Sequence, residues 1–196
     1  GSPFLLGTNG ESVSLSEKQK SELVNETVSY VNGKSTVYAG ISGNCMEETV
    51  SNARSYAQTG VDAVVAHLPF YFPLSANHMQ RYYEQLADSI PCPLILYNNP
   101  ITVKHSIPLD VIEQLSHHQN ITGIKDSERG MDRLGQSIER WGNRNDFVHL
   151  LGWTVQSAYA LLKGSGGIVP STGNFVPGLY RNLYDAALQN DHTKAY

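Results

Sequence analysis

Residues 94–100 read Leu94-Ile95-Leu96-Tyr97-Asn98-Asn99-Pro100, an apolar run that is closed by two amides and a proline. Short apolar runs of this kind are typical of strands that are buried on both faces of a parallel sheet. In α/β proteins the functional groups gather at the carboxyl ends of such strands. The stretch therefore predicts a buried parallel strand with a candidate site at its end.

Similar runs occur at intervals along the whole chain. The predicted strands are Phe4–Leu6, Thr36–Ile41, Ala63–Leu68, Leu94–Tyr97, Ile121–Ile124, Phe147–Leu151 and Gly167–Val169. Between them, apolar residues recur three or four positions apart, a spacing that places them on one face of a helix. Capping boxes that begin with Ser14 and Asn44 predict the starts of two of these helices. Repeated strand–helix units are typical of a parallel α/β fold.

Two architectures fit such repeated units, an open doubly wound sheet and a (β/α)8 TIM barrel. An open sheet gathers its ligand groups at one switch point, whereas a barrel draws them from the ends of many strands. Polar residues follow nearly every predicted strand here, as in the stretches 8–11, 125–127 and 171–174. This distribution favours the TIM barrel. The chain has 196 residues and seven predicted strands, whereas a barrel has eight strands in about 250 residues.

The composition is that of one globular domain and excludes several classes of function. With 14 Lys and Arg against 18 Asp and Glu the formal charge is −4, without the clustered basic face that nucleic acids or anionic membranes require. No apolar run approaches the ~20 residues that span a bilayer. Cys45 and Cys92 lack zinc or disulfide spacing, which fits a reducing compartment and predicts a cytoplasmic protein. Neither the histidines nor the glycines form a ligand motif, so we predict no metal and no separate cofactor.

Lys125 is the candidate with the most distinctive chemistry. It follows the apolar run 121–124, so its side chain is expected to emerge from the interior of the barrel. Burial disfavours the ammonium form and lowers the pKa of a lysine, and the neutral amine can attack a ketone to form a Schiff base. The alternative is a structural lysine that pairs with Asp126 at the edge of the sheet. Lysine is rarely buried without a reason, which shifts the balance toward function.

Three further residues are candidates for proton transfer near Lys125. Tyr97 ends the preceding strand, and consecutive strands of a barrel are neighbours, so its phenol is expected close to the amine. Thr8 can link two phenols by hydrogen bonds, and Tyr71 lies in the aromatic segment 69–73. Each has a structural alternative, namely a core tyrosine, an ordinary strand-to-helix turn and an aromatic packing or interface cluster.

Four motifs, in this order, resemble the dihydrodipicolinate synthase and N-acetylneuraminate lyase family of Schiff-base aldolases. They are Gly7-Thr8-Asn9-Gly10-Glu11, Tyr97-Asn98-Asn99-Pro100, Gly123-Ile124-Lys125-Asp126 and the stretch 167–174, and the collinear match covers essentially the whole chain. Each motif is weak alone, but the four in register are highly specific. The resemblance implies a TIM barrel and a class I aldolase or lyase that forms a homo-oligomer, either a tetramer or a dimer.

The resemblance also implies roles for individual residues. Lys125 would form the Schiff base with pyruvate or another 2-oxo acid. Tyr97 would transfer protons in a relay with Thr8 and Tyr71, and in many members the position of Tyr71 lies across a subunit interface. The backbone at Thr8 and Asn9 would bind the pyruvate carboxylate. The remaining substrate-binding positions are Ser127, Gly152, Thr154, Val169 and Ser171.

Two departures from family patterns bear on the substrate. Thr102 stands where dihydrodipicolinate synthases carry an arginine for their acidic second substrate, and residues 153–154 replace the acidic residues of sialic acid lyases. Ser127, Thr154 and Ser171 fit hydroxyl groups of a 2-keto-3-deoxy sugar acid instead. We therefore predict a pyruvate-dependent aldolase of such sugar acids, with dihydrodipicolinate synthase or N-acetylneuraminate lyase activity as the alternative.

The resemblance places Phe4–Leu6 in the second barrel strand, so that residues 1–196 are expected to form a single, incomplete TIM-barrel domain with strands 2 to 8. The first β/α unit and the C-terminal helices are then absent from this chain, and the open strand edges predict poor stability for the chain alone. This expectation motivates an alternative of another class, a non-catalytic 2-oxo acid binding protein or an inactive remnant.

Overall fold

A computed structural model describes residues 1–195, and in it seven strands form one parallel sheet in the order β1-β2-β3-β4-β5-β6-β7. The strands are β1 (Phe4–Leu5), β2 (Tyr38–Gly40), β3 (Ala63–His67), β4 (Leu94–Asn98), β5 (Ile121–Asp126), β6 (Val148–Leu151) and β7 (Gly167–Ile168). All seven predicted strands are present, and their ends differ from the predicted ends by at most two residues. Sequential order with parallel pairing is the topology of repeated β/α units.

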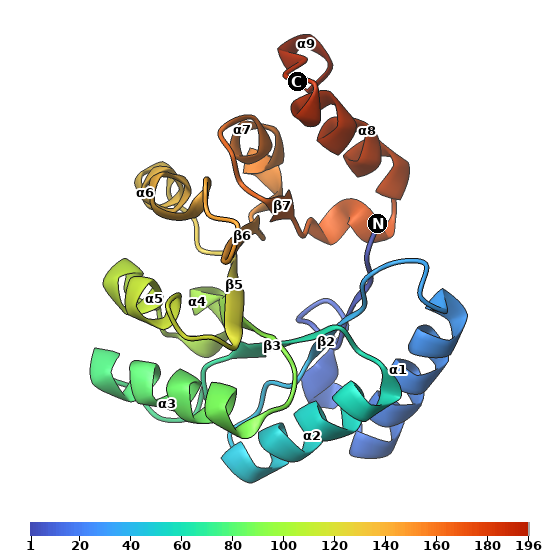
Figure 1. The fold of residues 1–196 in the computed structure, drawn as a ribbon, viewed down its shortest axis with the longest axis vertical. Coiled ribbons are helices and arrows are strands. Elements are labelled where there is room, and N and C mark those ends of the chain that lie inside the picture. Colours follow the sequence, from blue (N-terminus) through green and yellow to red (C-terminus); the bar gives the residue numbers. More distant parts are fainter. Residues whose placement is uncertain (196) are drawn as a thin grey trace.

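The helices lie in an arc along the outside of the curled sheet (Figure 1). The α-helices are α1 (Glu17–Val31), α2 (Met46–Thr59), α3 (Ala76–Ser89), α4 (Pro100–Val103), α5 (Leu109–Leu115), α6 (Met131–Trp141), α7 (Ser157–Leu162), α8 (Pro177–Leu188) and α9 (His192–Ala195). Short 3₁₀ helices are η1 (Ser12–Ser14), η2 (Thr154–Gln156) and η3 (Ser171–Asn174). Among the described residues, no helix combines the length and the apolar content that crossing a membrane demands.

The two faces of the sheet have different surroundings. The outer face packs on the helices in the main core, where Leu94, Leu96 and Trp141 are almost fully buried. The inner face holds a small cluster around Ile95 and Tyr97. Because the longer helices cover only the outer face (Figure 1), the sheet is curled like a barrel wall and is not an open doubly wound sheet.

The helix starts differ in detail from the predicted capping boxes. The box at α1 is formed by Ser16 and Gln19, because the predicted Ser14 belongs to η1. The N-cap of α2 is Cys45 without a side-chain bond. The predicted cap Asn44 instead accepts a hydrogen bond from the backbone N–H of Phe70 at 2.9 Å, and it thereby holds the loop that follows β3.

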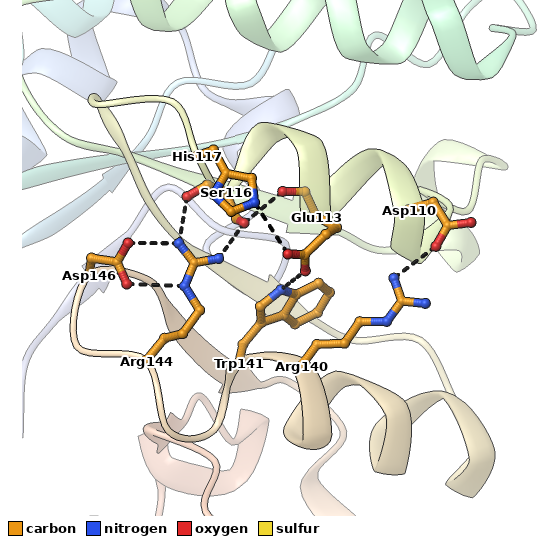
Figure 2. Close-up of polar contacts among 8 residues, drawn as sticks. All are labelled: Asp110, Glu113, Ser116, His117, Arg140, Trp141, Arg144 and Asp146. Atoms are coloured by element: carbon orange, nitrogen blue, oxygen red, sulfur yellow. Dashed lines mark hydrogen bonds and ion pairs between the residues drawn. The ribbon is translucent and has the colours of Figure 1, made fainter.

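A polar network joins α5 to the end of α6 and the turn before β6 (Figure 2). The Arg144 guanidinium donates to the Ser116 carbonyl at 2.9 Å and to both carboxylate oxygens of Asp146, at 3.0 and 2.7 Å. The Trp141 indole N–H donates to the carboxylate of Glu113 at 2.8 Å. These contacts lie on the outer side of the molecule, so they fix the spacing of two helices behind β5.

His149 in β6 is a buried histidine whose pKa makes stability depend on pH. It is 1% exposed, its Nδ1 lies 3.0 Å from Ser165 Oγ, and its ring stacks on Trp141. Burial, with a smaller contribution from Arg133, lowers its pKa from 6.5 to about 4 against the opposing effect of Asp126. The folded protein therefore keeps this imidazole neutral in a pH range where the unfolded chain binds a proton.

We expect His149 to destabilise the folded protein as the pH falls. Above pH 6.5 the imidazole is neutral in both states and leaves the free energy of unfolding unchanged. As the pH falls from 6.5 to 4, protonation of the unfolded state lowers the free energy of unfolding by up to about 3 kcal/mol. His149→Gln should remove most of this pH dependence in urea unfolding experiments. The control is His117→Gln, because His117 lies on the surface. An unchanged acid dependence in His149→Gln would contradict the assignment.

Candidate active site

Lys125 and Tyr97 lie side by side on the inner face of the sheet. They are register partners in the β4–β5 pair, as neighbouring barrel strands require. The Lys125 amine lies 4.1 Å from the centroid of the Tyr97 ring and 4.5 Å from that of Phe4. Lys125 is 8% exposed and Tyr97 is 4% exposed. The structure therefore encloses an amine between two aromatic rings at the end of a strand.

These surroundings shift the pKa values of both groups. Burial lowers the pKa of Lys125 below 10.5, and its neighbour Tyr97 only partly opposes this shift. Burial alone would raise the pKa of Tyr97, but the Lys125 ammonium and the hydroxyls of Thr8 and Ser127 outweigh it, so the pKa of Tyr97 lies below 10. A more readily deprotonated amine and a more readily deprotonated phenol are what nucleophilic attack and proton transfer require.

The Tyr97 hydroxyl belongs to a small hydrogen-bonded group with Thr8 and Asn99. Thr8 Oγ1 lies 3.0 Å from Tyr97 Oη. The Asn99 amide donates to Tyr97 Oη at 3.2 Å and to Thr8 Oγ1 at 3.3 Å. Sequence reasoning assigned no role to Asn99, although it lies in the motif that also holds Tyr97. A donor to the phenol oxygen stabilises its anionic form.

The loop after β1 brings Thr8 to this point through a tight turn. Leu6 leaves the strand because its φ is 56°, in the left-handed region, and the Gly10 N–H bonds back to the Gly7 carbonyl at 3.1 Å. Asn9 lies in the same turn and lines the cavity that contains Lys125. Thr8 and Asn9 are expected near the amine from the sequence, and both lie in the cavity wall.

The cavity beside Lys125 has a volume of about 1930 Å³ and also reaches residues of α1 and α8. This is larger than a typical ligand pocket of about 300–1,000 Å³, so the space near Lys125 is one part of a longer hollow. Four more of the expected substrate-binding residues line it, and they are Ser127, Thr154, Val169 and Ser171. Thr154 Oγ1 accepts a hydrogen bond from the Ser171 N–H at 3.2 Å, which links the ends of β6 and β7.

Gly152, the remaining expected binding residue, has a steric role in the cavity wall. A Cβ at this position would overlap the hydroxyl of Ser127, and the Gly152 N–H donates to the Asp126 carbonyl at 2.7 Å. Gly152→Ala should therefore lower the free energy of unfolding by about 1–3 kcal/mol in urea titrations. The matched control is Gly135→Ala in α6, which has open space around its Cβ and should stabilise slightly. Equal stability of the wild type and Gly152→Ala would contradict this steric assignment.

Tyr71 lies apart from the other candidates. It is 76% exposed, its ring packs on Phe72 at a centroid distance of 4.8 Å, and it lines neither cavity described here. The structure of one chain therefore brings together Lys125, Tyr97 and Thr8 without Tyr71.

A second cavity of about 270 Å³ adjoins Tyr97 and contains a residue that sequence reasoning missed, His67. The His67 ring centroid lies 6.2 Å from that of Tyr97. Its Nδ1 lies 2.7 Å from the Leu68 carbonyl oxygen, so Nδ1 donates and Nε2 is left as an acceptor in the neutral ring. Burial lowers the pKa of His67 and favours this neutral form. His67 is the register partner of Tyr97 in the β3–β4 pair, and the sequence alone does not give this register.

Comparison with known proteins supplies the family. The model of the dihydrodipicolinate synthetase family matches residues 2–196, which is nearly the whole chain. The chain belongs to the dihydrodipicolinate synthetase family. This confirms the family that the motifs at residues 7–11, 97–100, 123–126 and 167–174 predicted.

Individual relatives of the family agree with this assignment. The putative 2-dehydro-3-deoxy-D-gluconate aldolase YagE of Escherichia coli K12 is 30% identical over 98% of this chain and 64% of its own length. An uncharacterized DapA-like lyase of Halobacterium salinarum is 30% identical over 98% of this chain and 62% of its own length. The crystal structure of YagE in complex with pyruvate has a TM-score of 0.93 and is matched over 99% of this chain and 66% of that chain. The chain therefore spans 62–66% of the length of these relatives.

Proposed function

We propose that this protein is a class I aldolase or lyase that forms a Schiff base between Lys125 and pyruvate or another 2-oxo acid. The observation that carries the proposal is the buried Lys125 amine, 4.1 Å from the ring of a tyrosine whose hydroxyl is bonded to Thr8. The structure of the relative YagE with bound pyruvate supports the choice of 2-oxo acid. We further propose that the curled sheet supplies seven strands of an eight-stranded barrel wall, like those of the family.

The proposed reaction uses groups that the site holds. The neutral Lys125 amine attacks the C2 carbonyl of the 2-oxo acid, and the carbinolamine loses water to give the protonated Schiff base. Tyr97 carries protons between this centre and the Thr8 hydroxyl. In cleavage, Tyr97 takes the proton of the C4 hydroxyl, the C3–C4 bond breaks, the electron pair of that bond moves into the iminium to give an enamine, and C4 leaves as the aldehyde. Protonation at C3 and hydrolysis then return pyruvate and the free amine.

The carboxylate of the 2-oxo acid is proposed to bind at the turn that follows β1. Backbone N–H groups at Thr8 and Asn9 are the proposed donors, because turns of this kind present N–H groups to anions. Val169 is proposed to lie behind the Schiff base. In this arrangement the carboxylate stays at the turn while C2 of the substrate reaches the Lys125 amine.

We propose a hydroxylated sugar acid of the 2-keto-3-deoxy type as the aldol substrate. Ser127, Thr154 and Ser171 line the cavity and offer uncharged polar groups. The second cavity, beside Tyr97, has no lysine, arginine, aspartate or glutamate among its described lining residues, and it includes Thr102 and His67. In this second cavity a further carboxylate would lack a cationic partner, whereas hydroxyl groups would not need one. Arg129 lines the larger cavity and not this one. This argues against aspartate semialdehyde, which brings a carboxylate of its own. Sialic acid has no second carboxylate, and the argument against it is that residues 153–154 are not the acidic residues that sialic acid lyases carry there.

We also propose that the protein acts as a homo-oligomer, a tetramer or a dimer. The aromatic side chains of Tyr71 and Phe72 are both largely exposed, and exposed aromatic residues are common anchors in protein interfaces. In such an assembly Tyr71 is the residue proposed to complete the relay of Tyr97 and Thr8 in a neighbouring subunit.

A substrate panel with pyruvate release as the readout tests the proposed function. The panel contains 2-keto-3-deoxygluconate, its galactonate epimer and N-acetylneuraminate, and aspartate semialdehyde with pyruvate in the synthetic direction. We expect pyruvate release from at least one of the two 2-keto-3-deoxy sugar acids and no condensation of aspartate semialdehyde. If pyruvate raises the Tm of the complete protein but no substrate turns over, the protein is the non-catalytic binding protein of the alternative hypothesis.

A further inference from the structure

The strand residues directly after Tyr97 and Lys125 form a separate polar cluster on the opposite face of the sheet. Successive residues of a strand point to opposite faces, so Asn98 and Asp126 lie on the outer side, toward α6. Asn98 is fully buried and Asp126 is 3% exposed. Polar groups at this depth are costly unless every one of them has a partner.

Asn98 connects the two strand ends to the loops around them. Its amide donates to Asp126 Oδ1 at 2.8 Å and to Glu128 Oε2 at 2.9 Å. Its carbonyl oxygen accepts from the Ile107 N–H at 3.1 Å. One side chain therefore joins β4, the end of β5, the loop after β5 and the segment before α5.

Arg133 of α6 closes the cluster from the helix side. Its Nε donates to Asp126 Oδ2 at 2.8 Å and lies 3.3 Å from Glu128 Oε2, and its Nη2 donates to the Ile107 carbonyl at 3.0 Å. Glu128 also accepts from the Ser106 hydroxyl at 2.6 Å, and its N–H donates to Asp126 Oδ1 at 2.9 Å. The outer polar cluster is defined as Asn98, Ser106, Asp126, Glu128 and Arg133.

We propose that the outer polar cluster positions Lys125 and Tyr97 for catalysis, a role that rests on the proposed function. Asn98 and Asp126 share a peptide bond with Tyr97 and Lys125, so any rotation or slip of either strand end moves the amine relative to the phenol. Reacting groups must be held to within about 0.5 Å, and a displacement of 1 Å costs on the order of 100-fold in rate. We class the cluster residues as positioning residues because none of them lines either of the two cavities.

Stability alone explains this cluster poorly. A buried ion pair is weak evidence for stability, since apolar residues of the same volume are often as stabilising. The cluster also brings two carboxylates to one guanidinium, which is a net charge of −1 behind the strand ends. Hydrogen bonds are directional, whereas apolar packing is not. Each hydrogen bond of the cluster therefore fixes one strand end or loop relative to another.

The experiment compares two arginines of the same helix in the complete protein. Arg133→Met removes the cluster's cation, whereas the control Arg140→Met removes an ion pair between α6 and Asp110 on the surface (Figure 2). Arg133→Lys is the conservative variant. The readouts are the rate at which borohydride traps pyruvate on Lys125, kcat and KM in the aldol reaction, and Tm, all at a temperature where every variant is folded.

We expect Arg133→Met to slow adduct formation by 10-fold or more, which is on the order expected for a displacement of 1 Å or less. In the aldol reaction, kcat should fall and KM should stay unchanged. Arg140→Met should stay within about twofold of the wild type, and Arg133→Lys should recover part of the rate. A wild-type adduct rate in folded Arg133→Met overturns the positioning role alone, whereas no adduct in the wild type overturns the proposed function together with it.

A second variant keeps the proposal testable if Arg133→Met does not fold. Glu128→Gln retains the shape of the side chain and removes its charge, so it loosens the cluster without emptying it. The expected result is a several-fold slower adduct rate with a lower kcat. An unchanged rate and an unchanged kcat in folded Glu128→Gln would overturn the positioning role.

Discussion

Replacing Lys125 by methionine should abolish covalent capture of pyruvate and lower kcat/KM for the aldol reaction by about 1,000-fold or more. Methionine fills a similar volume between the rings of Tyr97 and Phe4 but has no nucleophile. The fold should survive the change. Since burial lowers the pKa of Lys125, its ammonium is held in the folded state at a cost that methionine does not have. The measurement is steady-state pyruvate release, with Tm measured on the same preparation.

The pH dependence of capture gives a second test of the same residue. Because burial lowers the pKa of Lys125, the rate of adduct formation should rise with pH and reach half its maximum below the ordinary lysine pKa of 10.5. The matched control is Lys104→Met, since Lys104 is an exposed lysine that lines neither cavity. Full activity in folded Lys125→Met, or equal losses in both variants, would rule out a nucleophilic role for Lys125.

Tyr97→Phe should lower kcat by about 100-fold to 10,000-fold while the Schiff base still forms slowly at Lys125. The change removes the hydroxyl that contacts Thr8 and Asn99 but keeps the ring beside the amine. The pKa of Tyr97 lies below 10, so loss of this proton carrier should also change the alkaline limb of the pH profile. Single-turnover kinetics of adduct formation and of aldol cleavage separate the two effects.

The control for Tyr97→Phe is another buried tyrosine of the same structure. Tyr83 is fully buried and donates to the Ala66 carbonyl at 3.1 Å, in the core between the sheet and α3. Tyr83→Phe should cost about 1 kcal/mol of stability and leave kcat unchanged. A similar fall in kcat for both variants would mean that Tyr97 acts through packing and not through proton transfer.

The strands and their polar ends were predictable because local sequence determines them. An apolar run such as Leu94–Leu96 has few alternatives to a buried strand, and its polar end follows directly in sequence. The capping box was not predictable at the correct residue, because Ser14 and Ser16 both have a glutamate or glutamine three positions later. The tight turn through Leu6 and η1 decides between them, and that turn depends on contacts outside the local sequence.

The site was predictable at Lys125 and Tyr97, and less so at the residues around them. The pairing of β4 with β5 brings these two residues together, independently of the conformation of the loops. The contacts of Asn99 and the position of His67 beside Tyr97 depend on strand register, which a single sequence does not specify. The outer polar cluster joins residues as far apart as Asn98 and Arg133, so no local motif contains it.

Borohydride reduction in the presence of pyruvate, followed by mass spectrometry of peptides, tests the central claim most directly. The claim predicts one modified residue, Lys125, whose mass increases by that of pyruvate less one oxygen atom, because the imine forms with loss of water and is then reduced by two hydrogens. The adduct should disappear in Lys125→Met. An unmodified Lys125 in the folded, complete protein, or an adduct on a different lysine, would contradict the account.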